Sequence, residues 1–197
     1  MNTVPQQHKG AQSSTEYSTT ALSSHMAEHL YEKARRNLLD VNRWKELAGT
    51  GSATFTVIDT RGAETGNVAR EGDSLRILLP VKSEKNESFD WVRVEKIEEI
   101  NTPGHRYIGM RVRPAVPPFY KDREVAHFFT RDATSTFCVE MQGTHIKAAV
   151  YGRNEKPNTQ VSRLMTRLKN LLIAIGAMIG FNKPQWKSLV KGWLKNN

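Results

Sequence analysis

An antiparallel hairpin is predicted by residues 134–151, TSTFCVEMQGTHIKAAVY. Gly143-Thr144 can form a two-residue type II′ loop, because this turn places a glycine at its first position. Glu140 and Lys147 then oppose each other on one face, where opposite charges attract. A slip by one residue would destroy the pattern on both faces at once. The other face receives three apolar pairs: Met141 with Ile146, Val139 with Ala148, and Phe137 with Val150.

Shorter segments with the same two-residue period precede the hairpin. Apolar and polar side chains alternate within residues 53–57, 75–79, 92–95 and 108–113, and turn-forming residues separate them. Residues 126–130 are a further, shorter strand candidate. No long crossover joins these segments, which favours antiparallel pairing. About six strands therefore predict a strongly bent antiparallel β-sheet or a small β-barrel.

Helical periodicity flanks the strands on both sides. Apolar residues recur every three or four positions from Ser24, the expected cap, to Ala48, and Gly49 is the expected end. A wide apolar stripe predicts a second helix over residues 158–181, and Pro184 opens a third. The expected fold class is α+β, with one N-terminal helix and two amphipathic C-terminal helices.

Composition divides the chain into three regions. Residues 1–24 are rich in Ser, Thr and Gln, and we expect a disordered tail there because they bury too little apolar surface. Residues 25–157 form the helix-plus-sheet domain. Residues 158–197 form a basic helical pair that we expect to pack on the same domain. START-like helix-grip domains have helices between their first two strands; the segment 59–73 is too short and Gly-rich for this, so no family is assigned.

The positive charge of the chain is concentrated at its C-terminal end. The formal net charge is +9, and residues 158–197 contain seven Lys and Arg but no acidic residue. Three interpretations are open. In the first, the helices simply cover the sheet, with lysines on their wet side. In the second, they lie on an anionic membrane through Trp186 and Trp193. In the third, they bind phosphate backbones through a lysine row: Lys183, Lys187, Lys191 and Lys195.

Arginines on the predicted strands give a second candidate binding surface. Trp91 and Arg93 share one strand face, and Arg111 and Arg113 alternate outward on another strand. Neighbouring strands would place guanidinium groups beside an aromatic ring, an arrangement that can hold phosphates or stack bases. The alternative is a solvated face with Arg–Glu pairs. Arg153 is a candidate anion clamp or a structural residue at the junction with the next helix.

The sequence does not point to a catalytic or metal centre. His25, Glu28 and His29 match a zinc-binding H-x-x-E-H pattern, but they lie at the frayed start of a helix without a third ligand. Cys138 with His127 or His145 lacks an activating group. We expect no cofactor and no metal. The single cysteine and the absence of a recognisable signal peptide are compatible with a cytoplasmic location.

These patterns favour a non-enzymatic binding or assembly module that acts through protein–protein contacts, with a protein partner or a second copy of itself. Two alternatives stay open at this point. The first is an anionic-surface binder, for nucleic acid or membrane. The second is a small-ligand carrier or an enzyme that uses the mouth of a barrel, for which the sequence names no small molecule.

Overall fold

The computed structural model of the 197-residue chain describes residues 3–49, 52–78, 89–119, 125, 127, 129–158 and 184–195. Within these ranges, eight antiparallel strands form one curled sheet in the order β1-β8-β7-β6-β5-β4-β2-β3. β1 and β3 are its edges. The strands are β1 (Ala11–Thr20), β2 (Thr54–Ile58), β3 (Glu64–Thr65), β4 (Ser74–Leu78), β5 (Asp90–Thr102), β6 (His105–Pro114), β7 (Thr134–Gln142) and β8 (His145–Glu155).

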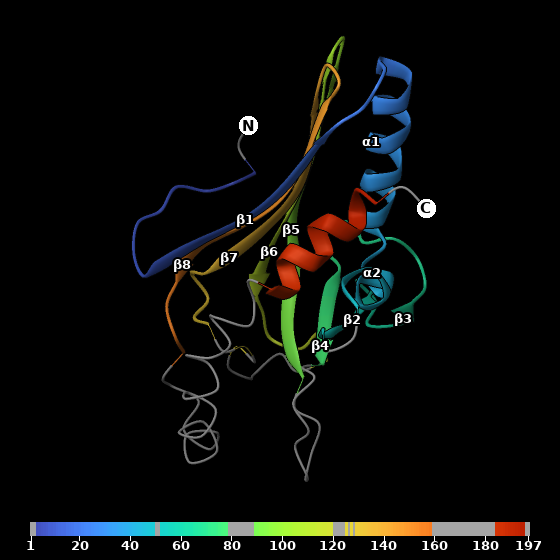
Figure 1. Ribbon diagram of the computed structural model, residues 1–197. Helices are drawn as coiled ribbons and strands as arrows, with labels where there is room; N and C mark the ends of the chain where they lie inside the picture. The colour runs from blue at the N-terminus through green and yellow to red at the C-terminus, as the bar shows by residue number, and fades with distance from the viewer. Residues whose placement is uncertain are drawn as a thin grey trace.

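The helices lie on one side of the sheet, which we call the helix-covered face (Figure 1). They are α1 (Ser24–Leu39), the short 3-10 helix η1 (Val41–Arg43), α2 (Trp44–Ala48) and a helix over residues 184–193. The single helix predicted up to Ala48 is therefore interrupted, because Asp40 leaves the helical conformation at φ −82° and ψ 68°. Ser23 caps α1 by accepting a hydrogen bond from the Met26 N–H at 3.3 Å.

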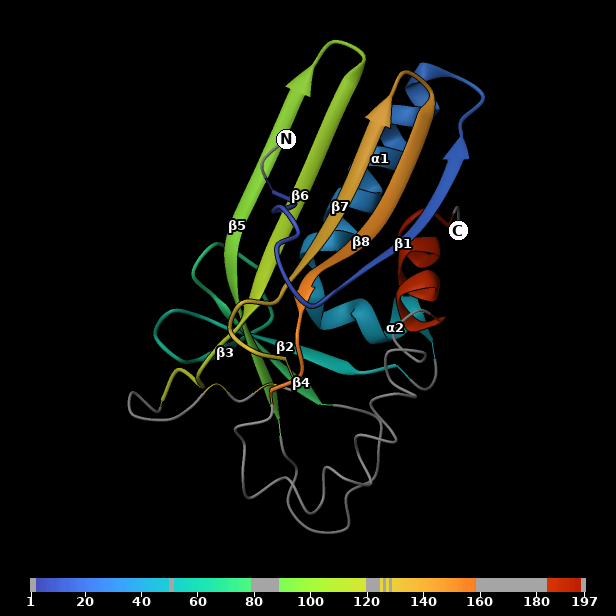
Figure 2. The same cartoon turned by 90° about the vertical axis from the view of Figure 1, so that its left-hand side faces the viewer.

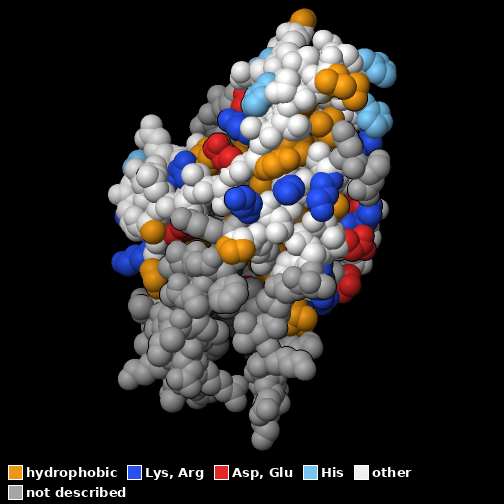
Figure 3. All heavy atoms as spheres, viewed as in Figure 1, with side chains coloured by type: hydrophobic (Ala, Val, Ile, Leu, Met, Phe, Trp, Pro, Cys, Tyr) orange, Lys and Arg blue, Asp and Glu red, His pale blue; other side chains and the backbone are white. Residues whose placement is uncertain are grey.

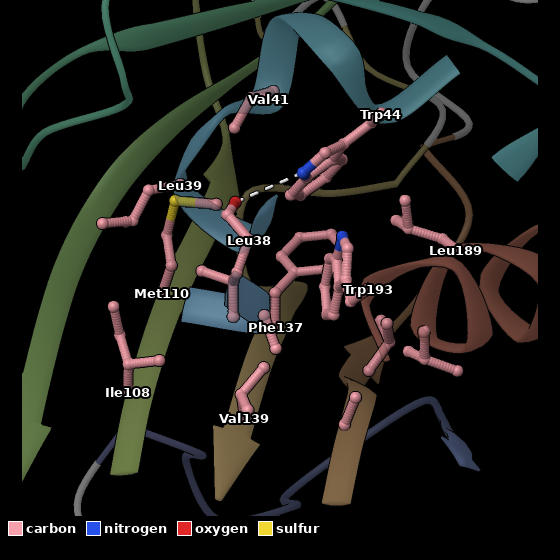
Figure 4. Packing of buried hydrophobic residues seen from close by; sticks show 14 of the residues in the cluster. Leu38, Leu39, Val41, Trp44, Ile108, Met110, Phe137, Val139, Leu189 and Trp193 are labelled. Carbon is pink, nitrogen blue, oxygen red and sulfur yellow. Dashed lines mark hydrogen bonds between the residues drawn. The ribbon is translucent and has the colours of Figure 1, made fainter. Parts of the chain in front are cut away.

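Aromatic side chains fill the centre of the helix-covered face (Figure 4). The ring centroid of Trp44 lies 4.6 Å from Phe137 and 5.7 Å from Trp193. The Trp44 indole N–H donates to the carbonyl oxygen of Leu38 at 3.2 Å, which satisfies its buried polar group. Leu189 and Trp193 are buried in the same core, so the helix 184–193 completes it. The predicted helix over 158–181 lies outside the described residues after Asn158.

The predicted hairpin is confirmed in every pair. β7 and β8 join Met141 to Ile146, Val139 to Ala148 and Phe137 to Val150. All six side chains are buried in the main core. Gly143 has φ 59°, a backbone conformation that favours glycine. On the other face, the Lys147 ammonium lies 3.5 Å from the Glu140 carboxylate, as their charges predict.

The prediction of a disordered tail over residues 1–24 differs from the structure. Ala11–Thr20 form β1, which pairs along its length with β8. Because β1 precedes α1, the helices α1, η1 and α2 do lie between the first two strands. The reason for setting aside a helix-grip arrangement was therefore wrong. The strand was missed because no residue of β1 is fully buried and Tyr17 is its one large apolar contact with the core, so the segment has no apolar period.

Residues 3–10 cross the other side of the sheet, the outer face, which is turned toward the viewer in Figure 2. Thr3 is fully buried there, and its carbonyl oxygen accepts from Arg111 Nη1 and Thr136 Oγ1, each at 3.3 Å. Farther along, the Asn154 side chain accepts from the N–H groups of His8 and Lys9. We call residues 3–10 the N-terminal strap. It runs beside a second, small core of buried residues: Tyr107, Cys138 and Ala149.

Two further expectations need correction. The sheet has eight strands in place of about six, because β1 and the two-residue β3 were not recognised. Its edge strands do not pair with each other, so the described strands form no closed barrel. The candidate strand over residues 126–130 is reduced, where described, to one isolated bridge between Phe129 and Pro157.

Among the helices that the structure describes, none is long and apolar enough to cross a membrane.

Candidate functional site: an arginine cleft on the outer face

A cleft of about 580 Å³ opens on the outer face between β5, β6 and the loops beside them. Three arginines line it: Arg93 from β5, Arg113 from β6 and Arg131 from the loop before β7. We call this set the arginine cleft. Two carboxylates, Glu71 and Glu95, also border it. The charged lining therefore carries one more positive than negative charge.

The sheet register brings the first two arginines together. Arg93 on β5 stands directly opposite Arg113 on β6. Their neighbours Val92, Val94 and Val112 belong to the main core. Since side chains alternate along a strand, the arginines must point to the outer face. The two strands are therefore neighbours, which is the condition under which the sequence would place these guanidinium groups side by side. Two positive groups on directly opposed residues repel each other unless an anion lies between them.

The carboxylate of Glu95 supplies part of the negative charge that these arginines require. The register of β5 and β6 shifts between Val94 and Lys96, which leaves Glu95 in a β-bulge. Glu95 reaches Arg111 Nε at 2.8 Å and Arg113 Nε at 3.0 Å. Burial alone would raise the pKa of Glu95, but the hydrogen bond and charge of Arg113, with those of Arg111, lower it. The carboxylate is therefore held in its charged form.

A carboxylate that borders the cleft also supports the bulge. The Ile97 N–H, just after the bulge, donates to a carboxylate oxygen of Glu71. Glu71 belongs to the turn before β4, so a loop side chain occupies the backbone donor at this irregular point of the ladder. Each of the two acidic residues at the cleft thus has a hydrogen-bond partner in the structure: Glu95 in Arg111 and Arg113, and Glu71 in the backbone of Ile97.

The three arginines differ in how they are held. Arg113 is fixed by Glu95 and also donates to the carbonyl oxygens of Arg131 and Asp132, at 3.1 and 3.4 Å. Arg93 and Arg131 are exposed, and within the described ranges no acidic side chain pairs with either. The cleft therefore combines one rigid guanidinium with two that can still take an anion, the geometry that bidentate recognition of carboxylate or phosphate uses.

The aromatic ring predicted beside the arginines is present but covered. Trp91 is opposite Arg76 in the sheet and only 8% exposed. Arg76 pairs with Glu64 at 2.8 Å and lies 5.0 Å from the ring centroid of Phe89. Neither Trp91 nor Arg76 lines the cleft. Stacking of a base on Trp91 is therefore not available in this conformation, whereas the solvated Arg–Glu pairs considered from the sequence are present at Glu95.

The other predicted site residues lie elsewhere. Arg111 borders the site through Glu95 and the strap carbonyl of Thr3. Arg153 on β8 donates to the backbone carbonyls of Ser13 and Gly152, at 3.1 and 2.7 Å, so its guanidinium ties β1 to β8. It does not line the arginine cleft. The helix that the anion-clamp interpretation of Arg153 requires lies outside the described residues.

The basic C-terminal helix occupies the opposite side of the sheet. Lys187 and Lys191 are exposed on this helix and Lys195 is exposed just after it, and basic side chains gather over this region in Figure 3. Trp193 is fully buried and Trp186 packs against the core, 5.3 Å from the ring of Phe137. These tryptophans point inward and cannot meet a membrane in this conformation. Lys183 lies outside the described residues. The sheet separates the lysines from the arginine cleft.

The catalytic and metal patterns are not assembled. Glu28 of the H-x-x-E-H pattern pairs with Arg106 at 2.8 Å, and the described residues hold no group of three His, Cys, Asp or Glu side chains that could bind a metal. Burial raises the pKa of the Cys138 thiol to about 12. His127 accepts the Phe129 N–H at 3.0 Å and His145 contacts Thr20 at 3.3 Å, so each of these histidines has another partner.

One buried carboxyl group has no role in the arginine cleft. Asp90 stands opposite Ile77 on the helix-covered face, and burial raises its pKa to about 7. The residue as a whole is half-buried, but its Oδ2 is buried without a hydrogen-bond partner within the described part of the chain. A lone buried carboxyl group is neutral over much of the acidic pH range. We therefore expect Asp90 to influence the pH dependence of the free energy of unfolding and assign it no role in binding.

Sequence reasoning missed two members of the site, Glu71 and Arg131. Both come from loops far along the chain from β5 and β6, and no periodicity predicts a loop side chain that approaches a distant strand. The bulge at Glu95 could not be seen either, because Val92–Glu95 shows an unbroken alternation of apolar and charged residues. The positions on regular strands, Arg93, Arg111 and Arg113, were the ones that a two-residue period could place.

Comparison with known proteins supports the fold only. No family model matches the sequence, and no curated protein matches it. A hypothetical protein, jhp0584 from Helicobacter pylori, has a similar structure, with a TM-score of 0.50 and 11% identity over 93% of this chain and 88% of that chain.

Two further structures are more distant. TTHA0849 from Thermus thermophilus is 13% identical over 93% of this chain and 94% of that one, with a TM-score of 0.42. Ara h 8.0201 is 8% identical over 94% of this chain and all of that one, with a TM-score of 0.40. The likeness to the Helicobacter protein shows a shared α+β fold with a curled antiparallel sheet.

Proposed function

We propose that this protein is a non-enzymatic binding module whose arginine cleft takes an anionic group, a carboxylate or a phosphate, of its partner. The observation that carries the proposal is the presence of three guanidinium groups from β5, β6 and a loop around one cleft, two of them without an acidic partner within the described ranges. Two unpaired cations near a fixed third would be stabilised by a bound anion.

The internal pair supports this choice of ligand. Glu95 already demonstrates how the site holds a carboxylate, because it is bound by Arg111 and Arg113 at 2.8 and 3.0 Å. A partner's anion would complete the same arrangement on the free side, between Arg93 and Arg131. The surface position of the cleft suits a group presented by a larger molecule, since an open cleft leaves room for the rest of the partner.

The exposed lysines of the C-terminal helix support a second candidate, binding to an anionic surface. Lys187 and Lys191 are exposed and stand one helical turn apart. Their attraction for a polyanion would be electrostatic and weakly specific. The burial of Trp193 speaks against insertion into a membrane, so this candidate takes the form of contact with a phosphate backbone.

A charge-matched pair of variants separates the two candidates. The double variant Arg93→Gln/Arg131→Gln and the double variant Lys187→Gln/Lys191→Gln each remove two positive charges from exposed positions. We expect the full-length protein to be retained on immobilised heparin at low salt and released as salt rises. The arginine double variant should elute at clearly lower salt, whereas the lysine double variant should elute close to wild type.

Two smaller probes identify the anion. Amide chemical shifts of β5 and β6 should respond to inorganic phosphate or to a short polyglutamate peptide in wild type, and not in the arginine double variant. Equal elution of wild type and the arginine double variant, without shift changes for either probe, would contradict the proposal. A loss of retention confined to the lysine double variant would assign binding to the C-terminal helix.

A further inference from the structure

The two edges of the sheet differ in how they are protected. β3 has only two residues, Glu64 and Thr65, and Glu64 carries a charge that pairs with Arg76. Short edge strands with charged side chains prevent pairing with other chains. The opposite edge is β1, ten residues long, with the sequence AQSSTEYSTT. It contains no proline, lysine or arginine and a single charge, Glu16.

The register shows which backbone groups of β1 point outward and have no partner among the described strands. The Ala21 N–H donates to the Thr144 carbonyl at 2.9 Å, which makes Ala21 and Thr144 a hydrogen-bonded pair at the end of the ladder. In an antiparallel ladder such pairs recur at every second residue. Thr19, Tyr17 and Thr15 therefore bond to β8. The N–H and C=O groups of the intervening residues point to the open edge: Ser14, Glu16, Ser18 and Thr20.

We propose that the protein forms a symmetric dimer in which β1 pairs antiparallel with β1 of a second copy, with the twofold axis at Tyr17. In this register Ser14 opposes Thr20 of the second copy, and Glu16 opposes Ser18. All four outward residues of each strand then form hydrogen-bonded pairs. Four such pairs exchange about eight hydrogen bonds, since each pair exchanges two.

The side chains fit this register. On the helix-covered face, Thr15 meets Thr19 of the second copy, and the two Tyr17 residues meet at the axis; Thr–Thr and aromatic pairs stabilise antiparallel strands. On the outer face, Glu16 meets a serine. The Glu16 carboxylate is already held by the Tyr151 hydroxyl at 2.5 Å, which turns it over its own sheet. No like charges are opposed.

Neighbouring registers are less favourable. An axis at Glu16 would place the two Glu16 carboxylates directly opposite each other, which is destabilising. An axis at Ser18 would leave Ser14 without a partner inside the strand. An axis at Thr15 would engage the irregular start of β1, where the register shifts between Ala11 and Ser13. The edge is therefore self-complementary in one register, and a second copy always presents the same edge.

The mass of the full chain tests the dimer. We expect sedimentation equilibrium to give twice the monomer mass of 22.3 kDa as concentration rises. Ser18→Pro removes an N–H that points to the open edge, so it leaves the β1–β8 ladder intact. It should raise the dimer dissociation constant roughly tenfold or more while thermal unfolding stays close to wild type. Ser18→Ala keeps the N–H and should behave as wild type.

Cross-linking tests the register. In Tyr17→Cys the two new thiols face each other at a Cα separation of about 4.5 Å, within the range of a disulfide. Mild oxidation should therefore produce a covalent dimer. Thr15→Cys lies on the same face of the same strand but opposite Thr19, so it should not cross-link to itself. The native Cys138 is buried and does not compete.

Three results would overturn the proposal. The first is a monomer at the highest soluble concentration. The second is a dimer that Ser18→Pro does not weaken. The third is equal cross-linking of Tyr17→Cys and Thr15→Cys. All three concern β1 alone, because the edge is remote in the strand order from β5, so they leave the test of the arginine cleft unaffected.

Discussion

The helix-covered face and the outer face of the sheet are built by the same strands, yet different forces hold them. The first is closed by α1, α2 and the helix 184–193 over buried aromatic rings. The second is covered only in part, by the N-terminal strap, and its centre is a network of Arg and Glu. Burial of apolar side chains stabilises the helix-covered face, whereas ion pairs and one β-bulge position the side chains of the outer face. The proposed binding site lies on the face that the helices leave uncovered.

The largest expected effect is on the helix-covered face. Trp193→Ala removes a fully buried indole between Trp44 and Phe137, and we expect a loss of roughly 3–5 kcal/mol in the free energy of unfolding. Denaturant unfolding followed by circular dichroism measures it. The matched control is Lys191→Ala, two residues earlier on the exposed side, which should change stability by less than about 0.5 kcal/mol. Equal effects would mean that the helix is not part of the core.

A pH titration sharpens the comparison through Asp90 on the same face. Its pKa is raised by burial from 3.8 to about 7, so the folded state binds the proton more tightly than the unfolded state. This contribution to stability is fully present below about pH 4 and is lost as pH rises toward 7, at up to ~1.4 kcal/mol per pH unit. In Asp90→Asn it should be absent.

The difference between the two proteins is the quantity to measure. The pKa of the partly buried residue His127 is lowered by desolvation to about 3, so it acts with the opposite sign over part of this range, and its contribution cancels in the difference. Unfolding free energies at several pH values should show Asp90→Asn gaining on wild type by on the order of 2–4 kcal/mol between pH 4 and pH 8. A constant difference across the range would show that Asp90 is solvated.

The smallest effect concerns the strap on the outer face. A Cβ added at Gly109 would collide with the Tyr107 hydroxyl and touch the Thr3 methyl group. Gly109→Ala should cost roughly 1–3 kcal/mol and displace residues 3–10, because overpacking forces neighbours apart. Limited proteolysis should then cut the N-terminal segment faster. Gly66→Ala, where the added group meets open space, is the control and should leave the cleavage rate unchanged.

The same contrast explains which parts of the fold and of the candidate site could be predicted from the sequence. The β7–β8 hairpin was predictable residue by residue, since its apolar pairs, charge pair and turn glycine agree. The outward direction of Arg93 and Arg113 was predictable from the two-residue period, whereas the pairing of their strands was not. Glu71 and Arg131 could not be predicted, because they approach from loops. The strand β1 could not be predicted either, because Ser and Thr occur both in strands and in mobile segments when no apolar residue marks a buried face.

The pairing of the first strand with the last has a consequence for synthesis. Thr15 finds its partner in Val150, so β1 leaves the ribosome long before β8 exists. At usual translation speeds the delay is on the order of ten seconds. An apolar strand exposed for that time would invite association with other nascent chains. A segment rich in serine and threonine stays hydrated until β8 has been synthesised. The polar composition that prevented the prediction of β1 thus also opposes aggregation of the unfinished polypeptide.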